Sequence, residues 1–388
     1  MATAAMLALS HGPLRAAAPA AGGDVMASAE KPQPGLTQYN GDWAVGCDNL
    51  LRCEAVALQP EGGDGEEPML LQVGRTGGPA GPTTLRVSGL SRLPAVISLV
   101  VDGREVAVLD GTASDEAVVR GADALRVVQE MAQATTIELR PGSDGGKPSR
   151  KPLPTLASFS SAGLAESLRF IDSRQGRTGT QSAFVARGTE PDSAVPTPPV
   201  VPVVAQVPSP DADAAPSLTH MEIEEARRIA RCEAQLPSEG AIELFPLDGN
   251  AALLLLTCDA GAYNVSAVPL IARGSAAGTR TFSVAHFDFA PGFTGEPGKP
   301  PLVVNALWDA RRGVLSSLAK GRGTGDCGAS ENYVWDGAAF RLIESRAMHV
   351  CRGAWEWIRL WEAEPSRAEP QTVAHGGAGG AGIAPAAQ

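Results

Sequence analysis

Six cysteines occur in this 388-residue chain as three neighbouring pairs: Cys47 with Cys53, Cys232 with Cys258, and Cys327 with Cys351. An even number of cysteines at short separations is typical of an exported protein that disulfide bonds stabilise. We predict these three pairings, because each then lies within one putative domain. The closest cysteines, Cys47 and Cys53, have the spacing C-x₅-C. This spacing is wider than that of a zinc knuckle, and it is not the C-x-x-C of redox motifs. Zinc binding and free thiols remain the alternatives.

Composition indicates a chain with many short strands. Gly and Pro are abundant, at 44 and 31 residues, and hydrophobic residues make up 44%. This hydrophobic content is enough to form two cores. A chain of this length also favours two domains over one. The net charge of −11 is accompanied by no run of Lys or Arg. Nucleic acid and anionic membrane surfaces are therefore unfavourable partners, and no apolar stretch is long enough to span a membrane.

The distribution of Pro, Gly and Ala suggests where the domains begin and end. Residues 189–217 are rich in proline, which favours extended chain and is typical of a linker. The first residues resemble a signal peptide that lacks its basic region. We expect a disordered or signal-like segment over 1–37, a β-rich domain with two helices over 38–188, a linker over 189–217, a helix-plus-sheet domain over 218–364, and a disordered tail over 365–388.

In the first domain, apolar runs of strand length are joined by the hairpin-type pair Asp102-Gly103. A capping box at Thr112-x-x-Asp115 predicts a helix that carries Leu125, Val128 and Met131 on one face, with a bend or late start at Gly121. A second helix is predicted by the spacing of three further apolar residues, followed by a glycine as its stop: Leu164, Leu168, Ile171 and Gly176.

The second domain is predicted to open with a helix at the capping box Thr219-His-Met-Glu222. Strands are then expected over 242–245, 251–258, 262–272, 281–287, 302–308, 313–318, 333–335, 339–344 and 357–361. Asp248-Gly249 and Asp336-Gly337 are hairpin turns in this pattern. The fold class is therefore α+β and mainly antiparallel β, with two disulfide-stapled domains joined by the Pro-rich linker.

Catalytic candidates are few. His286 and Asp288 lie two apart and share one face of a predicted strand, where they could form an acid–base pair, although a solvated sheet face explains them equally well. The segment Gly323–Gly328 matches G-x-G-x-x-G, but no helical pattern follows it, as a dinucleotide site requires. Neither a G-x-S-x-G elbow nor an S-x-x-K pair occurs. We therefore predict no cofactor and no metal site.

Binding candidates gather near two cysteine pairs. Asp48 and Asn49 between the first cysteines could contact a ligand, although both residues are also typical of turns. A group around the third pair combines aromatic and charged residues that are common at interfaces: Tyr333, Trp335, Asp336 and Arg352. Because a bridged loop loses less entropy on binding, it is a favourable place for contacts. Core packing is the alternative for Trp335.

Several motifs occur in an order that resembles a family of secreted proteobacterial proteins of unknown function. They are Trp43-x-Val-x-Cys47-Asp48-Asn49-x₃-Cys53, Gly261-Ala-Tyr-Asn264, Gly325-Asp-Cys-Gly328, Trp335-Asp-Gly337 with Phe340, and Cys351-Arg-Gly353. The resemblance covers about residues 40–362. The N-terminal half is also similar, more faintly, to invasion-associated locus B proteins. These resemblances imply periplasmic export and disulfides, but no activity.

Taken together, these features predict a periplasmic or secreted protein that binds an envelope protein or glycan without catalysing a reaction. A hydrolase that acts on envelope material is one alternative, and a passive structural component of the envelope is another. A hydrolase requires polar groups clustered in a concave pocket. A binding protein instead requires an exposed apolar or aromatic patch.

Overall fold

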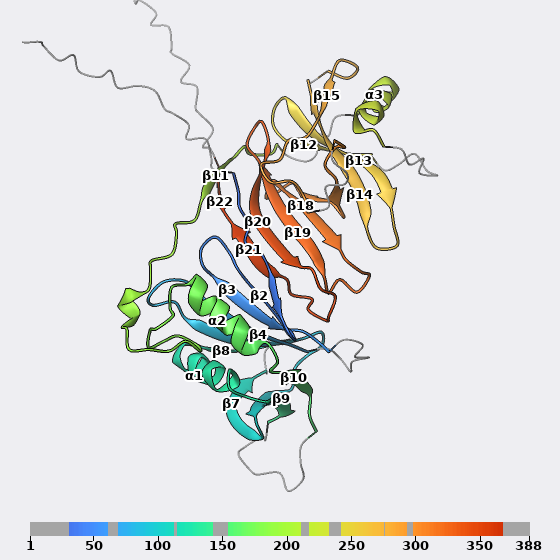
Figure 1. The fold of residues 1–388 in the computed structure, drawn as a ribbon. Helices are drawn as coiled ribbons and strands as arrows, with labels where there is room; N and C mark the ends of the chain where they lie inside the picture. The colour runs from blue at the N-terminus through green and yellow to red at the C-terminus, as the bar shows by residue number, and fades with distance from the viewer. Residues whose placement is uncertain are drawn as a thin grey trace, which may run out of the picture. The chain divides into compact units, whose positions relative to one another are not determined.

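A computed structural model describes residues 31–60, 69–111, 115–142, 154–210, 217–232, 242–274, 276–292 and 298–367. Across these residues the secondary structure is mainly antiparallel β-sheet with three α-helices (Figure 1). All three predicted cysteine pairs form disulfide bonds. None of the helices within the described ranges is long and apolar enough to cross a membrane. The predicted disordered tail begins too early, because residues 365–367 belong to a strand, and its remainder lies outside the described residues, as does most of the signal-like N-terminus.

The first half is built on a six-stranded antiparallel sheet. In spatial order its strands are β1 (Gln38–Asn40), β2 (Trp43–Cys47), β3 (Cys53–Ala57), β4 (Met69–Arg75), β5 (Thr83–Gly89) and β8 (Glu116–Arg120). Alternate residues of these strands, such as Val45, Ala55 and Val73, point into one hydrophobic core. Helices α1 (Gly121–Met131) and α2 (Leu164–Arg174) cover that face (Figure 1).

A second, four-stranded sheet completes the first half. Its order is β10 (Ala157–Ser160), β9 (Thr136–Pro141), β6 (Val96–Val101) and β7 (Arg104–Asp110). Asp102 and Gly103 join β6 to β7 with φ angles of 47° and 78°. A two-residue hairpin turn favours positive φ at both positions, and Asp and Gly tolerate it. The predicted hairpin is therefore confirmed.

The helix predictions of the first half are confirmed in part. Helix α2 buries the three predicted apolar residues, and Gly176 follows it with a φ of 65°, as expected of its stop. Thr112 lies outside the described residues, and Glu116–Arg120 form strand β8, which pairs with β5, so of the two expected outcomes at Gly121 the late start is confirmed. Helix α1 begins only at Gly121, where a φ of 67° allows the chain to turn sharply out of the strand.

The described residues of the second half form two antiparallel sheets and one helix. The first sheet has the order β12 (Ile242–Pro246), β13 (Ala251–Ala260), β14 (Val265–Arg273) and β15 (Thr281–Val284), with β16 (Val303–Val304) also paired to β14. The second is a meander of β17 (Leu307–Asp309), β18 (Val314–Lys320), β19 (Gly328–Trp335), β20 (Phe340–Met348) and β21 (Ile358–Glu362). Helix α3 (His220–Ala230) packs on the first sheet.

The second half confirms the predicted capping box and divides one predicted strand into two. The capping box is confirmed: Glu222 N–H donates to Thr219 Oγ1, and Thr219 N–H donates to the Glu222 carboxylate. The single strand expected over 302–308 is instead two short strands. Asn305 interrupts it with a φ of 44°, so the chain leaves β16 in one sheet and enters β17 in the next.

The Pro-rich segment over 189–217 is ordered in its described part. Val203–Gln206 forms β11, which pairs in parallel with β22 (Glu364–Arg367). Gln206 donates through its amide to the backbone carbonyl of Arg312 at 2.6 Å, and Val195 is buried. The segment therefore contacts both the turn between β17 and β18 and the strand β22.

The two halves also share a hydrophobic cluster. Val56 and Leu70 from the first half pack with Met348, Ile358 and Leu360 from the second. A β-carbon added to Gly46 on β2 would lie 3.0 Å from the side chain of Ile358, so the backbones approach closely here. The division into two domains stays a prediction.

Candidate functional site

The predicted binding residues Asp48 and Asn49 shape the turn between β2 and β3. The buried carboxylate of Asp48 accepts hydrogen bonds from the N–H groups of Leu50 and Arg52, at 2.8 and 2.9 Å. Burial raises the pKa of Asp48. The Asn49 amide exchanges two hydrogen bonds with the backbone of Glu362, at 2.9 and 2.8 Å. Asp48 thus bonds its own turn, as turn residues usually do, whereas Asn49 ties that turn to β21.

Tyr333 and Trp335 lie in the core of the second half. They are neighbours on one face of β19 and have almost no exposed surface. The Trp335 indole packs against Phe340, with ring centroids 5.3 Å apart, and donates to Asp248 Oδ2 at 3.0 Å. The phenol of Tyr333 meets Phe287 edge to face. In this structure neither ring can contact a partner from solution.

Asp336 and Arg352 hold loops in place. Asp336 accepts hydrogen bonds from the N–H groups of Ala338 and Ala339, both at 2.7 Å, and closes the predicted hairpin turn. The Arg352 guanidinium donates to the Gln59 carbonyl at 2.7 Å and to the Asp42 carboxylate at 2.5 Å. Arg352 therefore ties the second half to the first.

His286 and Asp288 lie beyond the end of β15 rather than on it. The backbone of Phe340 pairs with both, accepting from Asp288 N–H and donating to the His286 carbonyl. The buried Asp288 carboxylate accepts from Leu342 N–H at 2.9 Å and lies 3.9 Å from the Arg341 guanidinium. Burial raises the pKa of Asp288. The structure thus gives Asp288 two partners, neither of which is His286.

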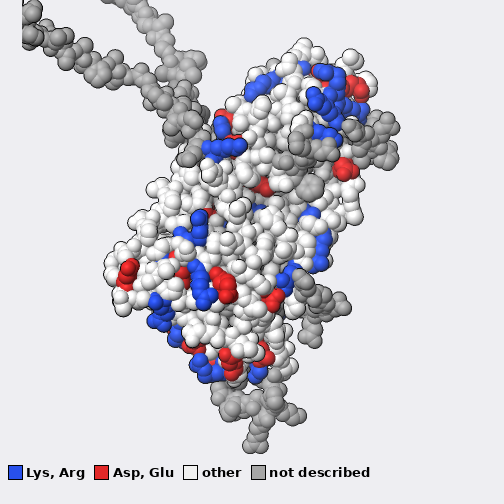
Figure 2. Space-filling view, viewed as in Figure 1, with Lys and Arg blue, Asp and Glu red and all other residues white. Residues whose placement is uncertain are grey.

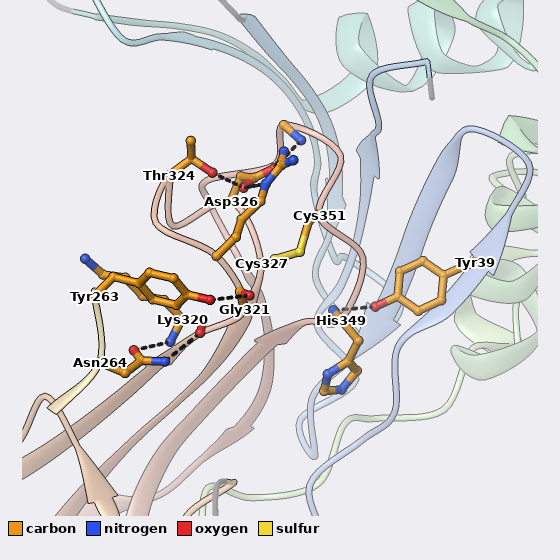
Figure 3. Close-up of a disulfide and its surroundings, with 12 residues drawn as sticks. Tyr39, Tyr263, Asn264, Lys320, Gly321, Thr324, Asp326, Cys327, His349 and Cys351 are labelled. Carbon is orange, nitrogen blue, oxygen red and sulfur yellow. Dashed lines mark hydrogen bonds and ion pairs between the residues drawn. A yellow bond between two sulfur atoms is a disulfide. The ribbon is translucent and has the colours of Figure 1, made fainter. Parts of the chain in front are cut away.

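The loops around the Cys327–Cys351 disulfide are fixed by polar contacts (Figure 3). Asp326 accepts from Arg322 Nε at 2.7 Å, Thr324 Oγ1 at 2.6 Å and Gly353 N–H at 2.7 Å. These bonds, that from Arg322 above all, hold the pKa of Asp326 well below its usual range. The disulfide loop is therefore a rigid support.

Gly321 brings a neighbouring loop onto this disulfide. A β-carbon at this position would lie 2.6 Å from Cys327 Sγ, so the close approach requires glycine. The Gly321 carbonyl accepts from the Tyr263 hydroxyl at 3.2 Å, and the backbone of Lys320 exchanges hydrogen bonds with the Asn264 amide (Figure 3). Tyr263 and Asn264 are thereby anchored beside the bridge.

An exposed group of apolar side chains surrounds Asn305, next to this anchored loop. It consists of Tyr263, Val265, Leu307 and Leu318, with exposed fractions of 41%, 42%, 65% and 37%. We call these four residues the apolar patch. Asn305 links the backbones beneath it: its amide donates to the carbonyls of Tyr263 and Leu318 at 3.3 and 2.9 Å, and accepts from Val265 N–H at 3.0 Å.

The sheet register explains why these apolar side chains reach the surface. Leu307 lies opposite Ser316 in the β17–β18 pair, so Leu307 and Leu318 are diagonal neighbours on the outer face. Trp308, the next residue, points into the core. Sequence reasoning missed the patch, although Tyr263 lies within one of the motifs on which the family resemblance rests.

A buried carboxyl group was also missed. Glu331 on β19 lies opposite Ser317 on β18 and Ser345 on β20, and all three are buried on the same sheet face. Its Oε1 accepts from Gly292 N–H at 3.1 Å, whereas Oε2 has no hydrogen-bond partner among the described residues. Burial raises the pKa of Glu331 to about 7. The carboxyl group is therefore partly protonated at neutral pH.

The face drawn in Figure 2 carries no large patch of a single charge among its described residues. Figure 2 shows Lys and Arg interspersed with Asp and Glu, with uncharged areas between them. Within the described ranges, no group of three or more His, Cys, Asp or Glu side chains is placed to hold a metal ion. The exposed apolar patch is the feature of this surface that most resembles a binding site.

Comparison with known proteins adds two findings. The profile of a family described as "Protein of unknown function (DUF1176)" matches residues 37–364. An uncharacterized protein of Escherichia coli (strain K12), YpfG, is 27% identical over 354 residues, which cover 82% of this chain and 91% of YpfG. No solved structure matches significantly.

Proposed function

This chain belongs to the DUF1176 family of proteins of unknown function, and we propose that it is an exported protein of the periplasm that binds an envelope protein without catalysis. Three disulfides support export, because such bonds form and persist in oxidising compartments. The division into two domains is part of this proposal, since each disulfide closes within one predicted half.

The observation that carries the binding proposal is the apolar patch. Four exposed apolar side chains lie around one asparagine, and the loop beside them is anchored to a disulfide-bridged support. A rigid apolar surface loses little entropy when it binds, and desolvation of its side chains favours association. Three of the four residues are aliphatic, which favours a protein partner with its own apolar surface over a glycan.

The two alternatives have less support. An envelope hydrolase would need His286 and Asp288 to act together, and the partners of Asp288 are Leu342 and Arg341. A passive structural component would not need an exposed patch, and long-lived assemblies bury larger apolar surfaces than four residues provide. The size of the patch suits a transient contact.

The binding proposal predicts a selective effect of polar substitutions in the patch. Leu307→Ser combined with Leu318→Ser should reduce retention of the partner from a periplasmic extract about ten-fold or more. The matched control combines Leu90→Ser with Val108→Ser, two other exposed apolar residues with exposed fractions of 65% and 57%. Both double variants should unfold within about 1 kcal/mol of the wild type, as surface variants usually do.

Retention is measured by quantitative mass spectrometry on immobilised wild type and variants, followed by titration with the purified retained protein. A set of retained proteins that is unchanged in the patch variant would contradict the proposal. Equal loss in the patch and control variants would do so as well.

A further inference from the structure

A depression of about 460 Å³ lies against helix α1 in the first half, away from the residues of the apolar patch. One wall is the β6–β7 hairpin, which lies beside α1 (Figure 1). The other wall is the loop that carries Arg187. The side chains that line it are mainly charged or amide groups: Arg104, Arg126, Gln129, Glu130, Gln133 and Arg187. Its volume falls within the range of small-molecule sites.

Three arginines, Arg104, Arg126 and Arg187, and two carboxylates, Asp102 and Glu130, line this depression. Glu130 bridges Arg104 at 2.6 Å and Arg126 at 2.9 Å, through different oxygens. Arg126 also donates to the Val106 carbonyl at 3.1 Å, which fixes its position against β7. The Arg187 guanidinium is exposed and has no hydrogen-bond or ion-pair partner within the described parts of the chain. Arginines therefore outnumber the carboxylates that line the depression.

In each wall of the depression, a carboxylate accepts hydrogen bonds from backbone N–H groups and so fixes the position of the loop. Asp102 in the hairpin turn accepts from the N–H groups of Thr135 and Thr136, at 2.9 and 2.8 Å. On the other side, the buried Asp172 accepts from the N–H groups of Phe184 and Val185, just before Arg187, at 2.8 and 2.9 Å.

Gln129 connects α1 to the same wall through a hydrogen bond to the Ala183 carbonyl at 2.9 Å. The backbone positions that carry the arginines are therefore fixed before a ligand arrives, which reduces the entropy lost on binding.

We propose that this depression binds a small anion that presents carboxylate or phosphate groups, with Arg187 as its principal contact and Arg104 beside it. The planar guanidinium matches the geometry of both anions and can donate two parallel hydrogen bonds to either. The amides of Gln129 on α1 and of Gln133 just after it supply neutral polar groups. A ligand would compete with Glu130 for Arg104 and Arg126.

The test is isothermal titration of the purified full chain with citrate and, separately, with inorganic phosphate at constant ionic strength. Saturable binding of at least one probe is expected, and the probe that binds identifies carboxylate or phosphate as the preferred group. Arg187→Gln should weaken this binding about ten-fold or more, as loss of a charge-assisted hydrogen bond does. Arg169→Gln, which removes an exposed arginine of α2, should leave it unchanged.

A second pair of variants tests for an increase in anion affinity. Glu130→Gln removes the competing carboxylate and should tighten anion binding several-fold, whereas Glu166→Gln on α2 should not. Absence of saturable binding for both probes would overturn the proposal. Equal effects of Arg187→Gln and Arg169→Gln, or of the two glutamate variants, would also overturn it, because only the net charge would then matter.

Discussion

Replacing Trp335 by alanine should lower the free energy of unfolding by about 4 kcal/mol, because truncation of a buried tryptophan leaves a large cavity. The indole is fully enclosed, packs against Phe340, and donates to Asp248. Trp335→Phe keeps most of the packing and loses only the donor, so its cost should be about 1–2 kcal/mol. Urea unfolding monitored by circular dichroism measures both variants.

The Trp335 variants also separate a core role from a binding role. A core residue changes stability first, and it changes partner binding only as far as the protein unfolds. If Trp335→Ala leaves stability unchanged while partner retention is lost, the residue contacts a partner, and its place in the core is wrong.

Replacing Glu331 by glutamine should make the protein more stable at pH 8, with little change at pH 4. Burial raises the pKa of Glu331 from 4.5 to about 7, so between these values the folded protein binds more protons than the unfolded chain. The contribution of Glu331 to the stability of the wild type therefore falls as the pH rises through this window. This contribution is lowest above pH 7. The difference between the two pKa values corresponds to about 3 kcal/mol.

Glutamine keeps an oxygen that can accept from Gly292 N–H and carries no charge at any pH. The free energy of unfolding of Glu331→Gln relative to the wild type, obtained from urea titrations between pH 4 and pH 8, should rise by up to about 3 kcal/mol. Glu166→Gln, on the exposed surface of α2, should give a difference that does not vary with pH. A constant difference for Glu331→Gln as well would show that its carboxyl group is not desolvated.

Local signals in the sequence predicted those parts of the fold that local chemistry determines. The Thr219–Glu222 capping box satisfies helix donors by itself, and the Asp102-Gly103 pair tolerates the positive φ of its turn. Cys47 and Cys53 lie opposite each other in the β2–β3 hairpin. In each case the residues that act on one another are close in the chain.

Pairing between distant segments explains what the sequence did not reveal. Residues 116–120 follow a capping-box pattern, but their backbone pairs with β5, and this pairing outweighs local helix preference. Glu331 shares the alternation of Tyr333 and Trp335, yet nothing near it in the sequence shows that Gly292 will cover its carboxyl group.

The position of a binding site near the third cysteine pair stays a prediction, and the apolar patch consists of other residues than those predicted. The surroundings of the Cys327–Cys351 pair were expected to carry contacts, and the apolar patch lies next to the loop anchored there. Tyr333 and Trp335 look like interface residues by type, but their alternation on β19 points both into the core. Leu307 is exposed because β17 pairs with β18, a register that depends on the interruption at Asn305.

We propose that the apolar patch contacts a protein in the cell envelope. Photo-crosslinking in living cells tests it most directly, with a photoreactive amino acid placed at Leu307 and, in a matched strain, at Leu90, which has the same exposed fraction of 65%. A crosslinked adduct of defined mass is expected from position 307 and none from position 90. No adduct at position 307, or the same adducts from both positions, would contradict it.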